Sequence, residues 1–209
     1  PFDPSLIKGR SSESNLLYLN TGTNENPDFS FLSNSFLQDQ MLDFGSGSYP
    51  VLFDYNADGL LDVLVGNYGY SDTCIFTPET GLQCTFTSKL ALLLNIGTPA
   101  QPAFQIAERN IAKLDLLQMQ SLIPAIGDMD ADGDQDLVCG NSKGKLVYCE
   151  NIATAGQNAD FVVKETAWLG IDAGDFSAPQ LTDIDGDGLI DLVVGKRNGT
   201  MNYYRNTGT

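Results

Sequence analysis

Short apolar runs alternate with acidic, polar segments along the chain. Three of these runs have the same length and setting: Val63–Val65, Leu137–Cys139 and Leu192–Val194, and each ends at a glycine. Such runs are too short for helices, and the flanking turn residues are typical of strands. No polar residue interrupts them, which predicts strands covered on both faces rather than on one.

A nine-residue acidic segment precedes each apolar run. The segments are 54–62, 128–136 and 183–191, and all three have Asp at positions 1, 5 and 9 and Gly at position 6. A proline stands four positions before the first Asp of each segment (Pro50, Pro124, Pro179), and the closing glycine stands twelve positions after it (Gly66, Gly140, Gly195). Agreement at this many fixed offsets indicates an internal repeat.

The repeat continues beyond the apolar runs. A strand-like segment leads to an asparagine (Asn20, Asn95, Asn151, Asn206), and a phenylalanine follows the first three of them (Phe29, Phe104, Phe161). Each unit therefore reads as four strands: one at the proline, the apolar run, the segment before the asparagine, and the segment led by phenylalanine. One unit carries 18 extra residues between its second and third strands, within about 68–88.

Four-stranded units of this length predict an all-β fold, and specifically a β-propeller; a β-solenoid or a sandwich is the alternative. The expected units are residues 11–48, 49–122, 123–177 and 178–209, within one propeller segment spanning 1–209. Two blades are complete and two are partial, which is fewer than a closed ring needs. We therefore expect part of a larger propeller, whose open edges pair with the remaining blades or with another chain.

The acidic segments have the pattern of metal-binding loops. Carboxylate or amide oxygens at positions 1, 3, 5 and 9, with the carbonyl of position 7, form an all-oxygen donor set that favours Ca²⁺ over transition metals and over Mg²⁺. Position 12 is Val65, Cys139 or Val194 instead of glutamate, so the loops are not EF-hands. If the segments were merely solvated turns, their crowded carboxylates would repel one another. The expected ligands of three calcium sites are Asp54, Asn56, Asp58, Leu60 and Asp62; Asp128, Asp130, Asp132, Asp134 and Asp136; and Asp183, Asp185, Asp187, Leu189 and Asp191.

This combined pattern resembles the FG-GAP/VCBS repeats of β-propellers of the integrin α-subunit type. The similarity covers nearly the whole chain and is most specific in the three acidic segments. It implies a propeller in which calcium binds between the first two strands of a blade and has a structural role. The insertion and the incomplete number of blades depart from that pattern.

Charge and composition narrow the possible functions. The 209 residues include 27 Asp plus Glu, 11 Lys plus Arg and no His, which gives a net charge of −16. So acidic a chain is not expected to bind nucleic acid, and no apolar run is long enough to predict membrane insertion. Without histidine, catalysis by an imidazole base is excluded. Twelve of the acidic residues lie in the three segments, and three Ca²⁺ ions would bring the net charge to −10.

The four cysteines divide into two pairs. Cys74 and Cys84 lie in the insertion, where we expect a local disulfide. Cys139 and Cys149 lie on two strands of one hairpin; if Gly140 pairs with Lys145, the two thiols point to opposite faces and remain free and buried. A disulfide and calcium loops together indicate an extracellular protein, secreted or at the cell surface.

Two functions remain open. The first is a non-catalytic, calcium-stabilised propeller module for adhesion or for binding a protein or carbohydrate ligand. The alternative is the propeller portion of a secreted polysaccharide-degrading enzyme of the lyase type, which the resemblance allows. The lysines show no pattern that identifies a catalytic group, so the binding module is favoured and no catalytic residue is assigned.

Overall fold

The computed structural model describes residues 16–33 and 42–208, and this part of the chain is built from antiparallel strands with two short 3-10 segments. The all-β prediction is confirmed. Within the described residues, no helix is long and apolar enough to cross a membrane. The start of the first expected unit, at residue 11, lies outside the described residues.

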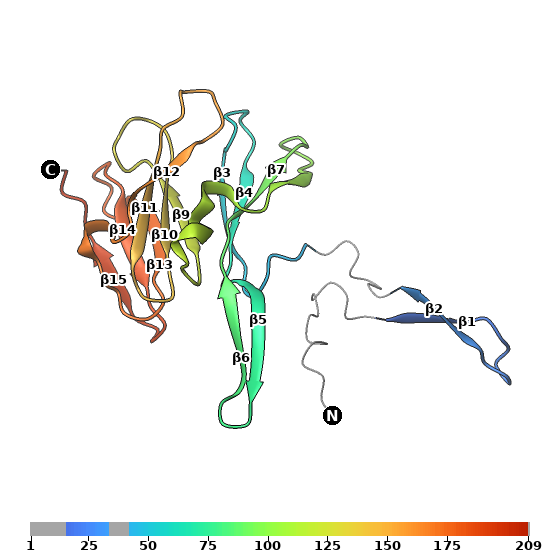
Figure 1. The fold of residues 1–209 in the computed structure, drawn as a ribbon. Coiled ribbons are helices and arrows are strands. Elements are labelled where there is room, and N and C mark those ends of the chain that lie inside the picture. Colours follow the sequence, from blue (N-terminus) through green and yellow to red (C-terminus); the bar gives the residue numbers. More distant parts are fainter. Residues whose placement is uncertain (1–15, 34–41, 209) are drawn as a thin grey trace.

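Two four-stranded sheets and one three-stranded sheet form the body of the molecule (Figure 1). We name them sheets I, II and III in chain order. Sheet I pairs its strands in the order β3 (Tyr49–Phe53), β4 (Asp62–Gly66), β7 (Ala91–Asn95), β8 (Phe104–Glu108). Sheet II has β9 (Ile123–Gly127), β10 (Asp136–Gly140), β11 (Leu146–Asn151), β12 (Phe161–Glu165), and sheet III has β13 (Ala178–Thr182), β14 (Asp191–Gly195), β15 (Met201–Tyr204).

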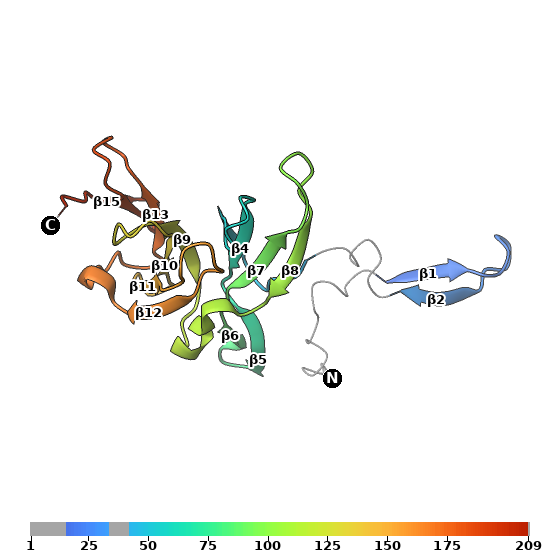
Figure 2. The same ribbon diagram turned by 90° about the horizontal axis from the view of Figure 1, so that it is seen from above.

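Two hairpins and two 3-10 segments complete the described elements. The strands β5 (Tyr70–Thr77) and β6 (Gly81–Thr87) form the insertion, which projects from sheet I, and β1 (Leu17–Asn20) pairs with β2 (Phe29–Ser33). In both ribbon views the β1–β2 hairpin lies apart from the other sheets (Figures 1 and 2). The 3-10 segments η3 (Ile111–Leu117) and η4 (Trp168–Gly170) lie in the connections from sheet I to II and from sheet II to III.

The three sheets pack face to face in chain order, and their first strands β3, β9 and β13 contact one another in sequence. The apolar run of β10 serves both junctions: Leu137 and Cys139 join a core shared with Leu64 of sheet I, while Val138 joins a core shared with Val194 of sheet III. This explains why the run contains no polar residue, as expected for a strand covered on both faces.

Glycine permits the close approach of neighbouring sheets. A Cβ built on Gly66 would lie 2.0 Å from the carbonyl oxygen of Leu122, and one on Gly140 would lie 2.0 Å from that of Ser177. Both carbonyls belong to the segment that enters the next sheet, two residues before its proline. The repeated glycine therefore marks a site where backbone packs directly on backbone.

The cysteine pairs are a partial success of the sequence prediction. Cys74 and Cys84 form the expected disulfide, and Cys139 and Cys149 are free and buried. The predicted register, however, is wrong by one residue: Gly140 pairs with Leu146, and Cys139 with Val147, so both thiols face the same core. Cys139 and Cys149 are diagonal neighbours across the strand pair. The Cα atoms of such neighbours are about 7–8 Å apart, which is beyond the usual span of a disulfide, so the two thiols remain free. Burial raises the pKa of the Cys149 thiol to about 12, which keeps it protonated.

Replacement of Gly140 by alanine should destabilise the protein by about 1–3 kcal/mol, because the added Cβ overlaps backbone that cannot move without separating two sheets. Gly195 provides a matched control at the same strand position, since the nearest atoms to its built Cβ, both of Ala178, are 3.7 Å away. Urea unfolding of the Gly140→Ala and Gly195→Ala variants measures the difference. Equal free energies of unfolding would contradict the close-approach argument.

Candidate metal centres

The three acidic segments form the connections β3–β4, β9–β10 and β13–β14, each linking the first strand of a sheet to the second. Their glycine at position 6 adopts a positive φ of 84°, 98° and 89° in Gly59, Gly133 and Gly188. The N–H of this glycine donates to the position-1 carboxylate, with distances of 2.8 Å to Asp54, 3.1 Å to Asp128 and 2.9 Å to Asp183. Each loop is thus closed by the same bond across five residues.

Two further hydrogen bonds recur in every loop. The side-chain oxygen at position 3 accepts the N–H of position 5, and the carboxylate at position 5 accepts the N–H of position 7. With the backbone donor named first, the bonds to position 3 are Asp58 to Asn56, Asp132 to Asp130 and Asp187 to Asp185. The bonds to position 5 are Leu60 to Asp58, Asp134 to Asp132 and Leu189 to Asp187. These bonds hold the oxygen donors of positions 1, 3 and 5 within one short turn.

The loops differ in which carboxylates they bring together. In the second loop, ligand oxygens of Asp128, Asp130 and Asp136 lie within 4.8 Å of one another, and in the third loop the same holds for Asp183, Asp185 and Asp187. Each group is close enough to hold one metal ion. The first loop, which has Asn56 at position 3, forms no such group of three carboxylates among the described residues.

The aspartate at position 9 has a second role that the sequence analysis did not identify. Asp62, Asp136 and Asp191 are 0%, 1% and 1% exposed. In each case one oxygen accepts the N–H of position 2, at 3.0 to 3.1 Å, in Tyr55, Met129 and Ile184. The other oxygen accepts the N–H of the repeated asparagine, which ends the third strand in Asn95 and Asn151 and follows it by two residues in Asn206, at 2.7 to 2.9 Å. This carboxylate therefore joins the loop to the third strand.

The repeated asparagine extends the same network. The side-chain oxygen of Asn95 accepts the N–H groups of Gly97 and Ala103, and that of Asn151 accepts those of Ala153 and Asp160. One asparagine thus organises the turn that leads to the phenylalanine of the fourth strand. The constant distance from position 9 to this asparagine in the second and third loops, 15 residues, was the signal available in the sequence.

Burial and mutual repulsion oppose ionisation in the second loop. Desolvation and four neighbouring aspartates raise the pKa of Asp134 to about 6. The pKa of Asp136 is also raised by burial, although the N–H groups of Asn151 and Met129 and the hydroxyl of Tyr148 act against this. Such a site gains from a cation, because a positive charge removes the repulsion that these shifts report.

Two carboxylate oxygens in this loop are orphaned. The Oδ1 atoms of Asp128 and Asp134 are shielded from solvent and have no hydrogen-bond partner. A cavity of about 400 Å³ lies between the first and second loops, and Asp134 lines it together with residues that include Tyr55 and Asp132. Buried carboxylate oxygens without donors fit a bound cation, so the residues of this loop suit a metal ion.

The third loop carries its own positive charge. Arg205, which follows β15, contacts Asp185 at 2.6 Å and Asp187 at 3.0 Å. The pKa of Asp191 is lowered, chiefly by the N–H of Asn206 and also by Arg205, whereas the pKa of the equivalent Asp62 is raised by burial. The repeat does not predict this role of Arg205, because the corresponding positions are Leu94 and Glu150.

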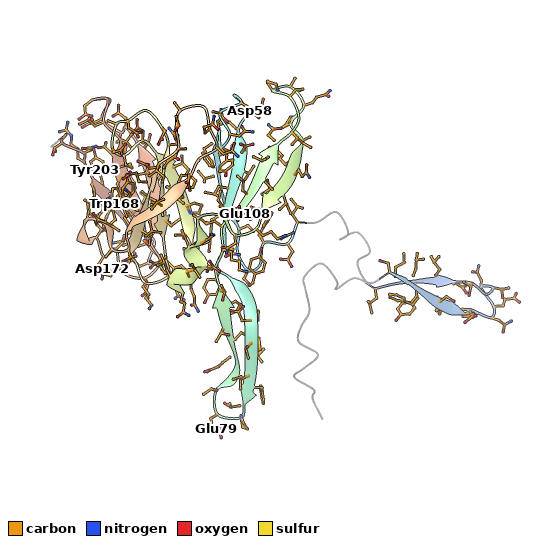
Figure 3. All side chains as sticks on the ribbon, turned by 45° about the horizontal axis from the view of Figure 1, so that its top comes forward. Asp58, Glu79, Glu108, Trp168, Asp172 and Tyr203 are labelled. Carbon is orange, nitrogen blue, oxygen red and sulfur yellow. A yellow bond between two sulfur atoms is a disulfide. The ribbon has the colours of Figure 1, made fainter. Side chains whose placement is uncertain are left out.

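The predicted ligands are therefore found in three similarly built loops, and six of them lie in groups suited to a metal ion. The carbonyl groups of Leu60, Asp134 and Leu189 stay predicted ligands. Asp58 lies at one end of the molecule, opposite Glu79 at the tip of the β5–β6 hairpin (Figure 3).

A comparison with models of known protein families and a search of curated proteins both found no match.

The position-9 carboxylate should stabilise the fold even without metal. Asp136→Ala leaves the N–H groups of Met129 and Asn151 without acceptors, and each buried unsatisfied group costs about 1–3 kcal/mol. In the presence of a chelator, urea unfolding should show a loss of at least about 2 kcal/mol. Asp132→Ala, at an exposed position of the same loop, is the control and should cost much less.

The raised pKa of Asp134 predicts a pH dependence in chelator. A group whose pKa rises on folding stabilises the protein fully below its unfolded value of 3.8, and this contribution is lost as the pH rises to about 6. Asp134→Asn removes the titration while keeping the backbone carbonyl. The stability of the variant relative to the original protein should therefore increase between these two pH values and stay constant above them. A difference that does not vary with pH would contradict the assignment.

Proposed function

We propose that the protein is a calcium-stabilised propeller module with one Ca²⁺ in each of its three acidic loops. The observation that carries the proposal is the hydrogen-bond framework common to the loops, which gathers oxygen donors in one turn three times over. The two groups of closely spaced carboxylates, with the orphaned oxygens of Asp128 and Asp134, support a cation at these positions.

Calcium is the cation that this donor chemistry favours. The candidate donors are carboxylate, amide and carbonyl oxygens, the chain contains no histidine, and its two free cysteines are buried in the core between sheets I and II. Hard oxygen ligands in a flexible turn suit Ca²⁺, whereas Mg²⁺ requires near-octahedral geometry and Zn²⁺ prefers nitrogen and sulfur.

The arrangement of the sheets supports a propeller. Three sheets of the same strand order pack face to face, and their first strands are adjacent, as expected for blades around an axis. The further blades of a larger propeller, or another chain, would cover the outer faces of sheets I and III. The Cys74–Cys84 disulfide is consistent with an extracellular location, secreted or at the cell surface.

Adhesion or binding of a protein or carbohydrate ligand is the role we propose for such a module. In this proposal the carboxylates of the loops accept backbone hydrogen bonds and bind the metal ion. They therefore have a structural role and not a catalytic one. The lyase-type enzyme remains the alternative function, and incubation of the protein with acidic polysaccharides, with product detection by ultraviolet absorbance, tests it.

Calcium should raise the thermal stability of the protein, because the ion binds only the folded loops. A site filled at a hundredfold excess over its Kd adds about 2.7 kcal/mol, and for a chain of this size each kcal/mol shifts the Tm by about 2–4 °C. Differential scanning calorimetry with chelator, then with added Ca²⁺ or Mg²⁺, measures the shift. An unchanged Tm in excess chelator would refute the proposal.

Single-loop variants separate metal binding from a general effect of charge. Asp130→Ala and Asp185→Ala should each lower the number of Ca²⁺ ions bound by one in isothermal titration calorimetry, and should reduce the calcium-dependent shift in Tm. Asp172→Asn is the control, since Asp172 is exposed, pairs with Lys145 and lies outside the loops.

A further inference from the structure

The two outer faces of the body, on sheets I and III, match each other. The junctions between sheets I and II and between sheets II and III are built in the same way, so each shows what a unit requires of its neighbour. Sheet III has the backbone acceptors of such a junction without a partner, and sheet I has the backbone donors of one without a partner.

A filled junction contains two backbone hydrogen bonds beside the glycine. Between sheets I and II, the N–H groups of Ser121 and Leu122 donate to the carbonyls of Tyr68 and Asn67, at 3.1 and 2.9 Å. Between sheets II and III, those of Phe176 and Ser177 donate to the carbonyls of Ser142 and Asn141, at 3.2 and 3.0 Å. The donors stand three and two residues before the proline, and the acceptors stand two and one residues after the glycine.

Sheet III has the acceptor side of this junction. We name Gly195, Lys196 and Arg197 the socket. Among the described residues, the carbonyl of Arg197 has no donor, and that of Lys196 has only the N–H of Gly199 within its own turn. A cavity of about 440 Å³ lies against the socket, lined also by Phe176 and Ala178.

Sheet I has the donor side. We name residues 47–50 the plug; it contains Gly47 and Ser48, three and two residues before Pro50. Gly47 has a φ of 66°, and the matching residues of the filled junctions have the same left-handed conformation, 64° in Ser121 and 56° in Phe176. The plug therefore has the same left-handed φ at this position as the two docked segments. The N–H groups of Gly47 and Ser48 have no acceptor among the described residues.

Burial separates the filled junctions from the two outer faces. Pro124 and Pro179 are buried, whereas Pro50 is exposed. On sheet III, Met201 is 74% exposed, although its counterpart in sheet II, Leu146, is fully buried. On sheet I, Leu52 is 56% exposed, although its counterpart in sheet III, Leu181, is only 7% exposed. Both outer faces thus present apolar side chains at positions that a neighbouring sheet covers elsewhere.

We propose that the socket binds the plug of a second copy of this chain. The two copies associate head to tail: Gly47 and Ser48 of one copy donate to the carbonyls of Arg197 and Lys196 of the other, Pro50 packs on Gly195, and Leu52 covers the outer face of sheet III. One chain carries both halves at opposite faces, so the contact is heterologous, and a pair of copies leaves one socket and one plug free for further copies. The proposal extends the idea that neighbouring units cover these faces, and it does not require calcium.

Sedimentation equilibrium of the intact chain tests the proposal. The expected result is a mass that rises with concentration from 22.6 kDa to at least twice that value. Gly195→Val should leave the protein monomeric, with a Tm equal to that of the original protein at concentrations where the latter is also monomeric, because a Cβ on Gly195 has room within one copy but would strike the backbone of a docked plug. Glu79→Gln, at the tip of the β5–β6 hairpin, is the control and should associate like the original protein.

A mixing experiment tests the head-to-tail direction. Leu52→Asp damages the plug side and Gly195→Val the socket side, so each variant alone should be monomeric while an equimolar mixture forms a two-copy species. A monomeric original protein, association that survives Gly195→Val, or a mixture that stays monomeric would each overturn the proposal. The Tm with and without Ca²⁺ reports the proposed calcium function separately, since the socket and plug contain no loop ligand.

Discussion

The buried aspartate at position 9 of each loop is the interaction on which the rest of the structure depends. Its two oxygens connect the start of an acidic loop to the asparagine that ends the third strand, so one carboxylate fixes the loop against the sheet. A charged group with about 1% exposure is tolerable only because backbone N–H groups surround it. The loop is consequently held in a donor-rich shape by the sheet itself, and a metal ion would add to an order that the chain already has.

Much of this architecture could be predicted from the sequence, because the repeat places proline, aspartate, glycine, asparagine and phenylalanine at fixed offsets. The strands and hairpins of the three sheets follow from these offsets, and the Cys74–Cys84 bond follows from the two cysteines of the insertion. The register of β10 and β11 could not be predicted, since Lys145 forms its bridge with Asp172 and leaves Gly140 to pair with Leu146. That contact joins segments far apart in the chain, and no local pattern contains it. The ion pairs of Arg205 could not be predicted from the repeat either, because Leu94 and Glu150 stand at the corresponding positions.

The sheets depend on one another as much as on their own hydrogen bonds. Val138 of β10 is fully buried because sheet III lies against it, and Leu64 of β4 is fully buried because sheet II does. A four-stranded unit of this kind has two apolar faces and cannot bury both alone, which is the general condition of repeat proteins. Gly66 and Gly140, at the ends of β4 and β10, bring the backbones close enough for the two hydrogen bonds of each junction.

Arg205 makes the three loops unequal although they share one sequence pattern. The first loop has three aspartates and the second has five, while the third has four with a guanidinium already bound to two of them. An incoming cation meets the strongest field in the second loop and must displace an internal competitor in the third. Occupancy is then expected to proceed in order and not all at once. On the proposed calcium function, the loops of one chain would therefore fill in graded steps as the calcium concentration rises, rather than as a single switch.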